Sequence, residues 1–380
     1  MSNQFDETKF LSAIEKTGFD LEFYVQTILR SHGWHVINNR FYVDDLKGTE
    51  REIDIVAYKV KSTKKMDYRT TLIISCKKVS ESYWAFMTSN RDDTDSDFDY
   101  CPLCVNSSNT AVSYMLNNER NVLVDRLLAE NEVSSLFAIP RKVFAFQQIN
   151  KNSYKTEDDK RIFDSIITAI KAASYEMQND TKNKKKYCNS YFLISVLDGE
   201  MKEVAFDEDG TKNISDIEEI HYINRHIVGG KDDFYQVHFI TKNHLDKSVA
   251  LYDKLADYNL ELYDWAEREF YNFLLADEHK DRAQDRWRDF QNKFMSEMWD
   301  DYMDPNRNVY NNSYITDYKL SEDGKQIKMY WNLSLFSNPD FLIKNLQKDK
   351  KLQKCLKKYL WKYFHYKGEV ILVRSKETYI

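Results

Sequence analysis

The chain has 380 residues, with 55 lysines and arginines against 61 aspartates and glutamates, so its formal net charge is −6. Hydrophobic residues make up 42% of the chain, which excludes a disordered protein. The chain has only nine glycines and four prolines, which excludes collagen-like and proline-rich proteins. Mild acidity argues against a nonspecific DNA-coating protein, because binding phosphates needs an excess of Lys and Arg, but it is compatible with an enzyme that has a local basic surface.

The first part of the chain predicts one helix followed by three strands. Apolar residues at helical spacing predict a helix over Thr17–Ser31 that ends at Gly33. The three strand-like runs that follow are Val36–Val43, Glu52–Val60 and Thr70–Ser75. The third run is almost continuously apolar, which is typical of a buried central strand, and it leads directly into Cys76, Lys77 and Lys78.

The middle of the chain is less regular. We expect an irregular insertion around 81–140, in which the acidic run Arg91–Asp99 is a solvated loop, because it lacks the glycine and terminal glutamate of a calcium-binding hand. Further on, Tyr191–Leu197 and Glu203–Phe206 are expected to form a hairpin around Asp198-Gly199. The other predicted elements here are the strand Val143–Ile149, a helix over Ile162–Met177, the polar loop Asp180–Lys186, the strand Phe234–Ile240 and a helix near Leu245–Asp257.

Composition changes after about residue 262, which predicts two domains, 1–262 and 263–380. Tyr263–Asp304 is predicted to form one or two helices, and its 12 acidic and six basic residues account for the whole net charge of the chain. After the break at Pro305 and Asn306–Ser313, the predicted elements are the strands Tyr314–Leu320 and Gln326–Leu333, a lysine-rich helix over Pro339–Phe364 and the strand Glu369–Val373. The predicted fold is α/β, with a mixed central sheet flanked by helices and a C-terminal α+β domain.

The N-terminus has no apolar run typical of a secretory signal, and no apolar stretch is long enough to span a bilayer. We therefore expect a cytoplasmic protein with no membrane partner. Cys101 and Cys104 form a lone CxxC. Because no second pair of ligands follows at zinc spacing, two ordinary loop thiols are favoured over a zinc site.

Three polar residues lie at places where they could carry chemistry. Glu22 lies beside the apolar stripe of the first helix, Asp54 in the second strand, and Lys77 just past the end of the third. Hydrolysis of a phosphodiester requires carboxylate and carbonyl oxygens to hold a divalent cation, and an ammonium group to orient water and offset charge on the phosphate. The order of these residues along the chain permits such a site.

The sequence here resembles the restriction-endonuclease-like, PD-(D/E)XK superfamily of nucleases. The resemblance covers residues 15–260 and is carried by Gly18-Phe-Asp-Leu-Glu22, Gly33-Trp34, Arg51-Glu-Ile-Asp54, Ser75-Cys-Lys-Lys78 and Tyr83-Trp-Ala-Phe86. It implies that Asp54, Glu22 and the Cys76 carbonyl hold Mg²⁺, for which Mn²⁺ can substitute, and that Lys77 is the catalytic lysine. It also implies DNA as substrate and a setting in bacterial restriction or anti-phage defence.

One position departs from the pattern of that superfamily. Ser75 stands where Glu, Asp or Gln is usual, two residues before the lysine, and Glu22 or Glu81 could compensate for the missing acid. Three hypotheses stay open: a DNA endonuclease, an inactive nucleic-acid-binding or scaffold protein on a nuclease fold, and an RNA-directed nuclease. Because cutting both strands of a duplex commonly needs two sites, we expect a homodimer, with a partner protein of a defence system as a further possibility.

Two groups of basic residues are candidates for contacts with phosphate. The first surrounds the proposed site, and its hairpin Lys59–Lys65 is interpreted either as a phosphate grip or as a solvated tip. The second is the lysine-rich helix of the tail. Its lysines are interpreted as a DNA-tracking surface, as a solvated face, or as partners of the acidic segment Tyr263–Asp304. The lysines and arginines of the first group are Lys47, Arg51, Lys59, Lys61, Lys64, Lys65, Arg69, Lys77 and Lys78.

Overall fold

In a computed structural model, the chain divides into two compact units, Met1–Tyr263 (unit 1) and Asp264–Ile380 (unit 2). The structure describes residues 5–15, 17–44, 48–91, 103–180, 185–228, 230–276, 280–299, 308–309, 312–321 and 324–375. No helix in these ranges is long and apolar enough to cross a membrane.

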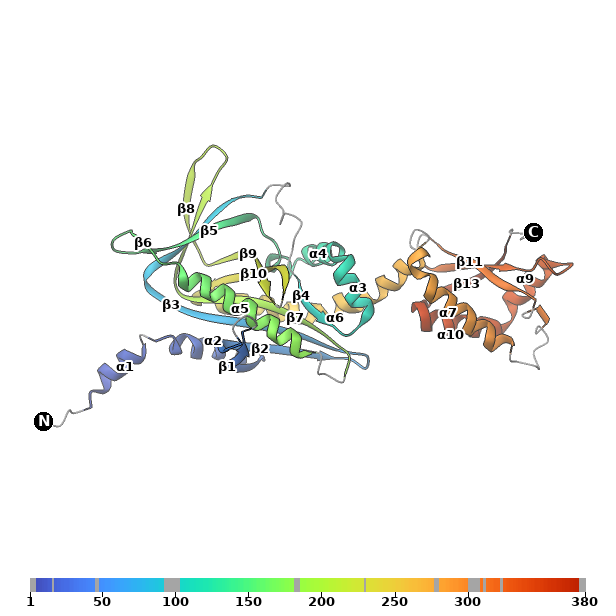
Figure 1. Cartoon of the computed structure of the whole chain (residues 1–380), viewed down its shortest axis with the longest axis horizontal. Coiled ribbons are helices and arrows are strands. Elements are labelled where there is room, and N and C mark those ends of the chain that lie inside the picture. The colour runs from blue at the N-terminus through green and yellow to red at the C-terminus, as the bar shows by residue number, and fades with distance from the viewer. Residues whose placement is uncertain are drawn as a thin grey trace. The chain divides into compact units, whose positions relative to one another are not determined.

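Unit 1 is built on a mixed sheet of ten strands, in which the path β1-β2-β3-β7-β10-β9 forms the main body (Figure 1). Parallel pairing joins β3 to β7 and β7 to β10, and the other pairs are antiparallel. The strands are β1 His35–Val43, β2 Glu50–Ser62, β3 Asp67–Asn90, β4 Cys104–Ser107, β5 Arg141–Asn150, β6 Thr156–Glu157, β7 Tyr187–Phe206, β8 Lys212–Ile217, β9 Glu219–Val228 and β10 Lys231–Thr241. The predicted α/β class with a mixed central sheet is confirmed.

Helices α2 and α5 of unit 1 pack on this sheet through apolar stripes. In α2, Leu21, Val25 and Leu29 are buried at the expected spacing, and the helix ends before Gly33, whose φ of +78° favours glycine. The longer α5 buries its stripe against β3 and β7, and the hydrophobic core lies between them. The helices are α1 Glu7–Glu15, α2 Phe19–Ser31, α3 Thr110–Asn118, α4 Arg120–Ala129, α5 Lys160–Asn179 and α6 Leu245–Leu275, of which α6 continues past Tyr263 into unit 2.

Two predictions about the long strands are wrong. Lys77 does not follow the third strand but lies inside it, because β3 runs for 24 residues, from Asp67 to Asn90. The hairpin around Asp198-Gly199 does not form either, since β7 passes straight through both residues. Glycine often indicates a turn because its backbone is flexible. Gly199 instead allows two strands to approach each other closely, as described below.

The segment 81–140 is also more regular than expected. It contains the end of β3, then β4, α3 and α4. The acidic run, apart from Arg91, and Cys101 of the CxxC lie outside the described residues, as do Lys47 and parts of the loops Asp180–Lys186 and Asn306–Ser313. Cys104 begins β4 and is partly buried.

Unit 2 is a small α+β unit, as predicted. Its sheet has the order β11-β12-β13, with β11 antiparallel and β13 parallel to β12. The predicted lysine-rich helix divides in two at Asp349, whose side chain accepts hydrogen bonds from the N–H groups of Lys351 and Leu352 and so caps the second helix. The elements are α7 Lys280–Trp299, β11 Tyr314–Leu320, β12 Gln326–Asn332, α9 Pro339–Lys348, α10 Lys350–Phe364 and β13 Glu369–Arg374.

Candidate functional site

The candidate site lies where β2 and β3 separate. The last pair between these strands joins Ile55 to Ile74. Beyond it β2 pairs only with β1, while β3 continues beside β7. Asp54 is the first residue of β2 past this pair, and Ser75, Cys76 and Lys77 are the first three of β3. The separation of the strands therefore brings together residues that are far apart in the sequence.

Past the end of its pairing with β2, β3 receives a side-chain hydrogen-bond acceptor from β2 in the carboxylate of Asp54. Its Oδ2 accepts a hydrogen bond of 2.6 Å from the Cys76 N–H and one of 3.3 Å from the Ser75 hydroxyl. The Lys77 Nζ lies 3.9 Å from the same oxygen, and both charged side chains are 26% exposed. Asp54, Ser75, Cys76 and Lys77 therefore form one cluster that is open to solvent at its charged end.

Glu22 of α2 belongs to the same electrostatic environment. Burial raises the pKa of its carboxyl group, the negative charges of Asp54 and Glu52 raise it further, and Lys77 lowers it. Burial, followed by the charges of Asp54 and Glu22, raises the pKa of the Cys76 thiol well above its usual range. The thiol is therefore neutral at pH 7, and the negative charge at the site comes from carboxylates, which Lys77 partly offsets.

The oxygen ligands at this site suit Mg²⁺ better than a metal ion that is bound entirely by protein side chains. Among the described residues, no three or more His, Cys, Asp or Glu side chains are grouped so that they could hold a metal ion. Glu22 and Asp54 supply two carboxylates, and Mg²⁺ is commonly bound by one or two carboxylates together with waters and substrate phosphates. Ser75 is fully buried and hydrogen-bonded to Asp54, so it supports that carboxylate.

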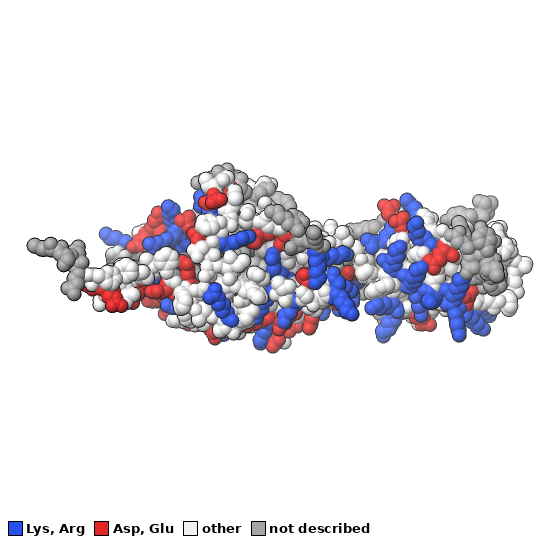
Figure 2. All heavy atoms as spheres, turned by 90° about the horizontal axis from the view of Figure 1, so that it is seen from below, with Lys and Arg blue, Asp and Glu red and all other residues white. Residues whose placement is uncertain are grey.

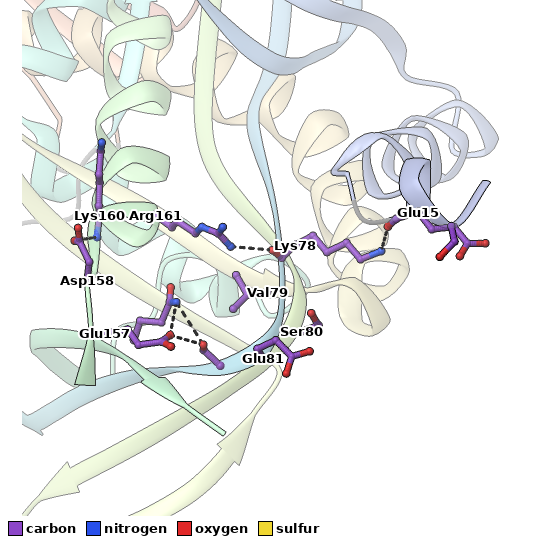
Figure 3. A pocket seen from close by; sticks show the side chains of 12 residues that line it. Glu15, Lys78, Val79, Ser80, Glu81, Glu157, Asp158, Lys160 and Arg161 are labelled. Atoms are coloured by element: carbon purple, nitrogen blue, oxygen red, sulfur yellow. Dashed lines mark hydrogen bonds between the residues drawn. The ribbon is translucent and has the colours of Figure 1, made fainter. Parts of the chain in front are cut away.

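A hollow of about 1120 Å³ lies along the segment of β3 that begins at Lys78, and no residue of the cluster lines it (Figure 3). Lys78 reaches across to α1 and donates a hydrogen bond to the backbone carbonyl of Glu15, while Arg161 Nη1 of α5 donates one of 3.4 Å to the Lys78 carbonyl. Glu81, which we considered as a substitute ligand, is exposed and lines this hollow. The hollow thus presents both signs of charge.

Sequence reasoning did not single out Glu157, another carboxylate that lines the hollow. Glu157 accepts hydrogen bonds from Ser82, Gln148 and Asn150, and these bonds lower its pKa. Nothing in the local sequence marks Glu157, because its donors come from β3 and β5 and meet it only through strand pairing.

Gly199 is a second residue that sequence reasoning misread. Pairing between β3 and β7 is interrupted between Lys78 and Tyr83. A Cβ added to Gly199 would lie 2.5 Å from the carbonyl oxygen of Val79. Gly199 thus allows the irregular part of β3, just after Lys77, to approach β7.

The basic residues around the site are largely engaged within unit 1. Lys59 and Lys61, in the hairpin interpreted as a phosphate grip or a solvated tip, lie 2.7 and 2.5 Å from carboxylate oxygens of Asp253 and Asp257 in α6. Asp253 also accepts hydrogen bonds from the Trp34 indole and the His32 ring. These two lysines therefore attach the hairpin to α6.

Comparison with protein-family models, with curated proteins and with solved structures finds no match to this chain.

Proposed function

We propose that this protein is a metal-dependent endonuclease that hydrolyses DNA phosphodiester bonds. The observation that carries the proposal is the cluster at the separation of β2 and β3, where Asp54 and Lys77 lie 3.9 Å apart with Glu22 nearby. Carboxylates beside a lysine at one end of a mixed sheet are what the resemblance to the PD-(D/E)XK nucleases implies. The hollow that begins at Lys78, the residue after Lys77, offers room for a nucleic-acid strand.

The chain's own residues have distinct roles in this proposal. Asp54, Glu22 and the Cys76 carbonyl would hold Mg²⁺ or Mn²⁺, which supplies positive charge to polarise the phosphate and lowers the pKa of a bound water. The Lys77 ammonium orients the attacking water and offsets charge that develops on the phosphate. Ser75 and the Cys76 N–H fix the Asp54 carboxylate in place through their hydrogen bonds.

Cleavage of supercoiled plasmid tests the proposal. With Mg²⁺ or Mn²⁺ the protein should nick or linearise the plasmid, and Asp54→Asn and Lys77→Gln should each abolish the cutting. Asp20→Asn is the matched control, because Asp20 is an exposed carboxylate in the same helix as Glu22 and should leave cutting unchanged. Undiminished cutting by both site variants would overturn the assignment.

Ser75 favours a second candidate function, an inactive nucleic-acid-binding or scaffold protein on the same fold. The usual acidic ligand is missing, and Ser75 is fully buried beside Asp54. Tight DNA binding, with no cleavage in any divalent ion and no calorimetric signal for Mn²⁺, would favour this function. An RNA-directed nuclease uses the same chemistry, so matched DNA and RNA substrates should be incubated side by side.

The setting is part of the proposal. We infer that the protein is a cytoplasmic enzyme of bacterial restriction or anti-phage defence. It acts as a homodimer, because two sites are needed to cut both strands of a duplex. A second protein of the same defence system is its proposed partner. Sedimentation of the purified chain with and without a DNA duplex measures the predicted dimer.

A further inference from the structure

The outward side of α10 in unit 2 is a continuous basic face. The helix contains six lysines and no carboxylate. At 3.6 residues per turn, these lysines fall within an arc of about 140°, while the buried residues occupy the opposite arc. The lysines that define this basic face are Lys350, Lys351, Lys354, Lys357, Lys358 and Lys362, and all are exposed. Figure 2 shows Lys and Arg side chains gathered over unit 2 in this view.

Among the residues that the structure describes, ion pairs neutralise only part of this charge. Lys358 forms an ion pair of 2.6 Å with Glu297 of α7, which supports the interpretation that the lysines contact the acidic segment at this position. Among the described residues, no carboxylate lies within ion-pair distance of Lys354, Lys357 or Lys362. Holding so many like charges on one helix face destabilises the unit unless a polyanion covers them.

Trp361 lies among these lysines, in the last turn of α10, and is 38% exposed. Its ring stacks on His365 at 4.7 Å between centroids, and the ammonium of Lys367 lies 4.4 Å from its centroid. The indole therefore holds a further cation beside the face through a cation–π contact. Since this ring is the one large apolar group among the lysines of α10, the face lacks the apolar stripe that an interfacial membrane helix needs.

We propose that the basic face of α10 binds the phosphate backbone of duplex DNA. Lysines at adjacent turns of a rigid helix present regularly spaced charges, which suits contact with a phosphate row and reads no base sequence. This inference is independent of the proposed function, because binding without a metal ion requires only unit 2's lysines and no chemistry at Asp54.

The experiment measures the affinity of the full chain for a fluorescent DNA duplex in EDTA, over a range of salt concentrations. Each phosphate contact contributes about −0.9 to the slope of log K against log salt. The triple variant Lys354→Gln, Lys357→Gln and Lys362→Gln should therefore have a slope less steep by about 2.7 and bind at least tenfold more weakly at 0.1 M salt.

A matched control removes the same charge elsewhere. Lys155, Lys212 and Lys247 are exposed lysines of unit 1, and their replacement by glutamine should leave the slope unchanged. An unchanged slope in the α10 triple variant, or an equal loss in the control, would overturn the proposal. Binding to vesicles of phosphatidylcholine with phosphatidylserine through the same lysines, without binding to DNA, would overturn it as well. Circular dichroism of both variants ensures that folded proteins are compared.

Discussion

Replacing Asp54 by alanine and by asparagine is expected to separate the structural role of its carboxylate from the role of its charge. Asp54→Ala removes the acceptor of the Cys76 N–H, and Cys76 is only 8% exposed, so the amide has little access to water. A buried donor without a partner costs about 1–3 kcal/mol. Loss of the repulsion that raises the Glu22 pKa offsets part of this cost. We therefore expect Asp54→Ala to lower the free energy of unfolding by about 1–2 kcal/mol.

Asp54→Asn keeps an oxygen that can accept the same hydrogen bond but removes the negative charge. Its stability should stay within about 0.5 kcal/mol of the wild-type protein, whereas its plasmid cleavage and Mn²⁺ binding should be lost. Urea denaturation measures the first quantity, and gel assays and calorimetry measure the second. If Asp54→Ala is as stable as Asp54→Asn, the carboxylate does not hold the Cys76 amide, and if Asp54→Asn cuts at the wild-type rate, its charge is not required for catalysis.

Three further predictions concern the packing of unit 1. Gly199→Ala should lower stability by about 1–3 kcal/mol, because its Cβ would meet the Val79 carbonyl at 2.5 Å, and an unchanged melting temperature would contradict that approach. Asp253→Ala should cost about 1–3 kcal/mol in urea denaturation by leaving the Trp34 indole N–H unpaired, and Asp253→Asn should restore most of it. Burial lowers the pKa of His221 in the folded protein, so as the pH falls below about 6.5 the imidazole is protonated in the unfolded chain but not in the folded one. The free energy of unfolding should therefore decrease below about pH 6.5, and His221→Gln should weaken this pH dependence.

The sequence alone determined the elements whose signal is local. The stripe of Leu21, Val25 and Leu29 predicted α2, and the apolar run after Thr70 predicted a buried strand, because helix and strand periodicity depend only on neighbours in the chain. The same local signals located most elements of unit 2. The order of Glu22, Asp54 and Lys77 along these elements permitted a shared site, and their role in catalysis stays a prediction.

Tertiary structure alone decided the features that depend on distant partners. Gly199 carries a turn signal, yet it lies within a straight strand because β3 passes close to it. Lys59 was a candidate phosphate contact, yet Asp253, nearly two hundred residues later, pairs with it. The sequence predicted Asp54 as a metal ligand. Only the separation of β2 and β3 in the folded chain shows that its carboxylate also accepts a hydrogen bond from the Cys76 N–H. Hydrogen bonds and ion pairs of this kind form between segments that the chain brings together on folding, so residue spacing along the sequence carries no record of them.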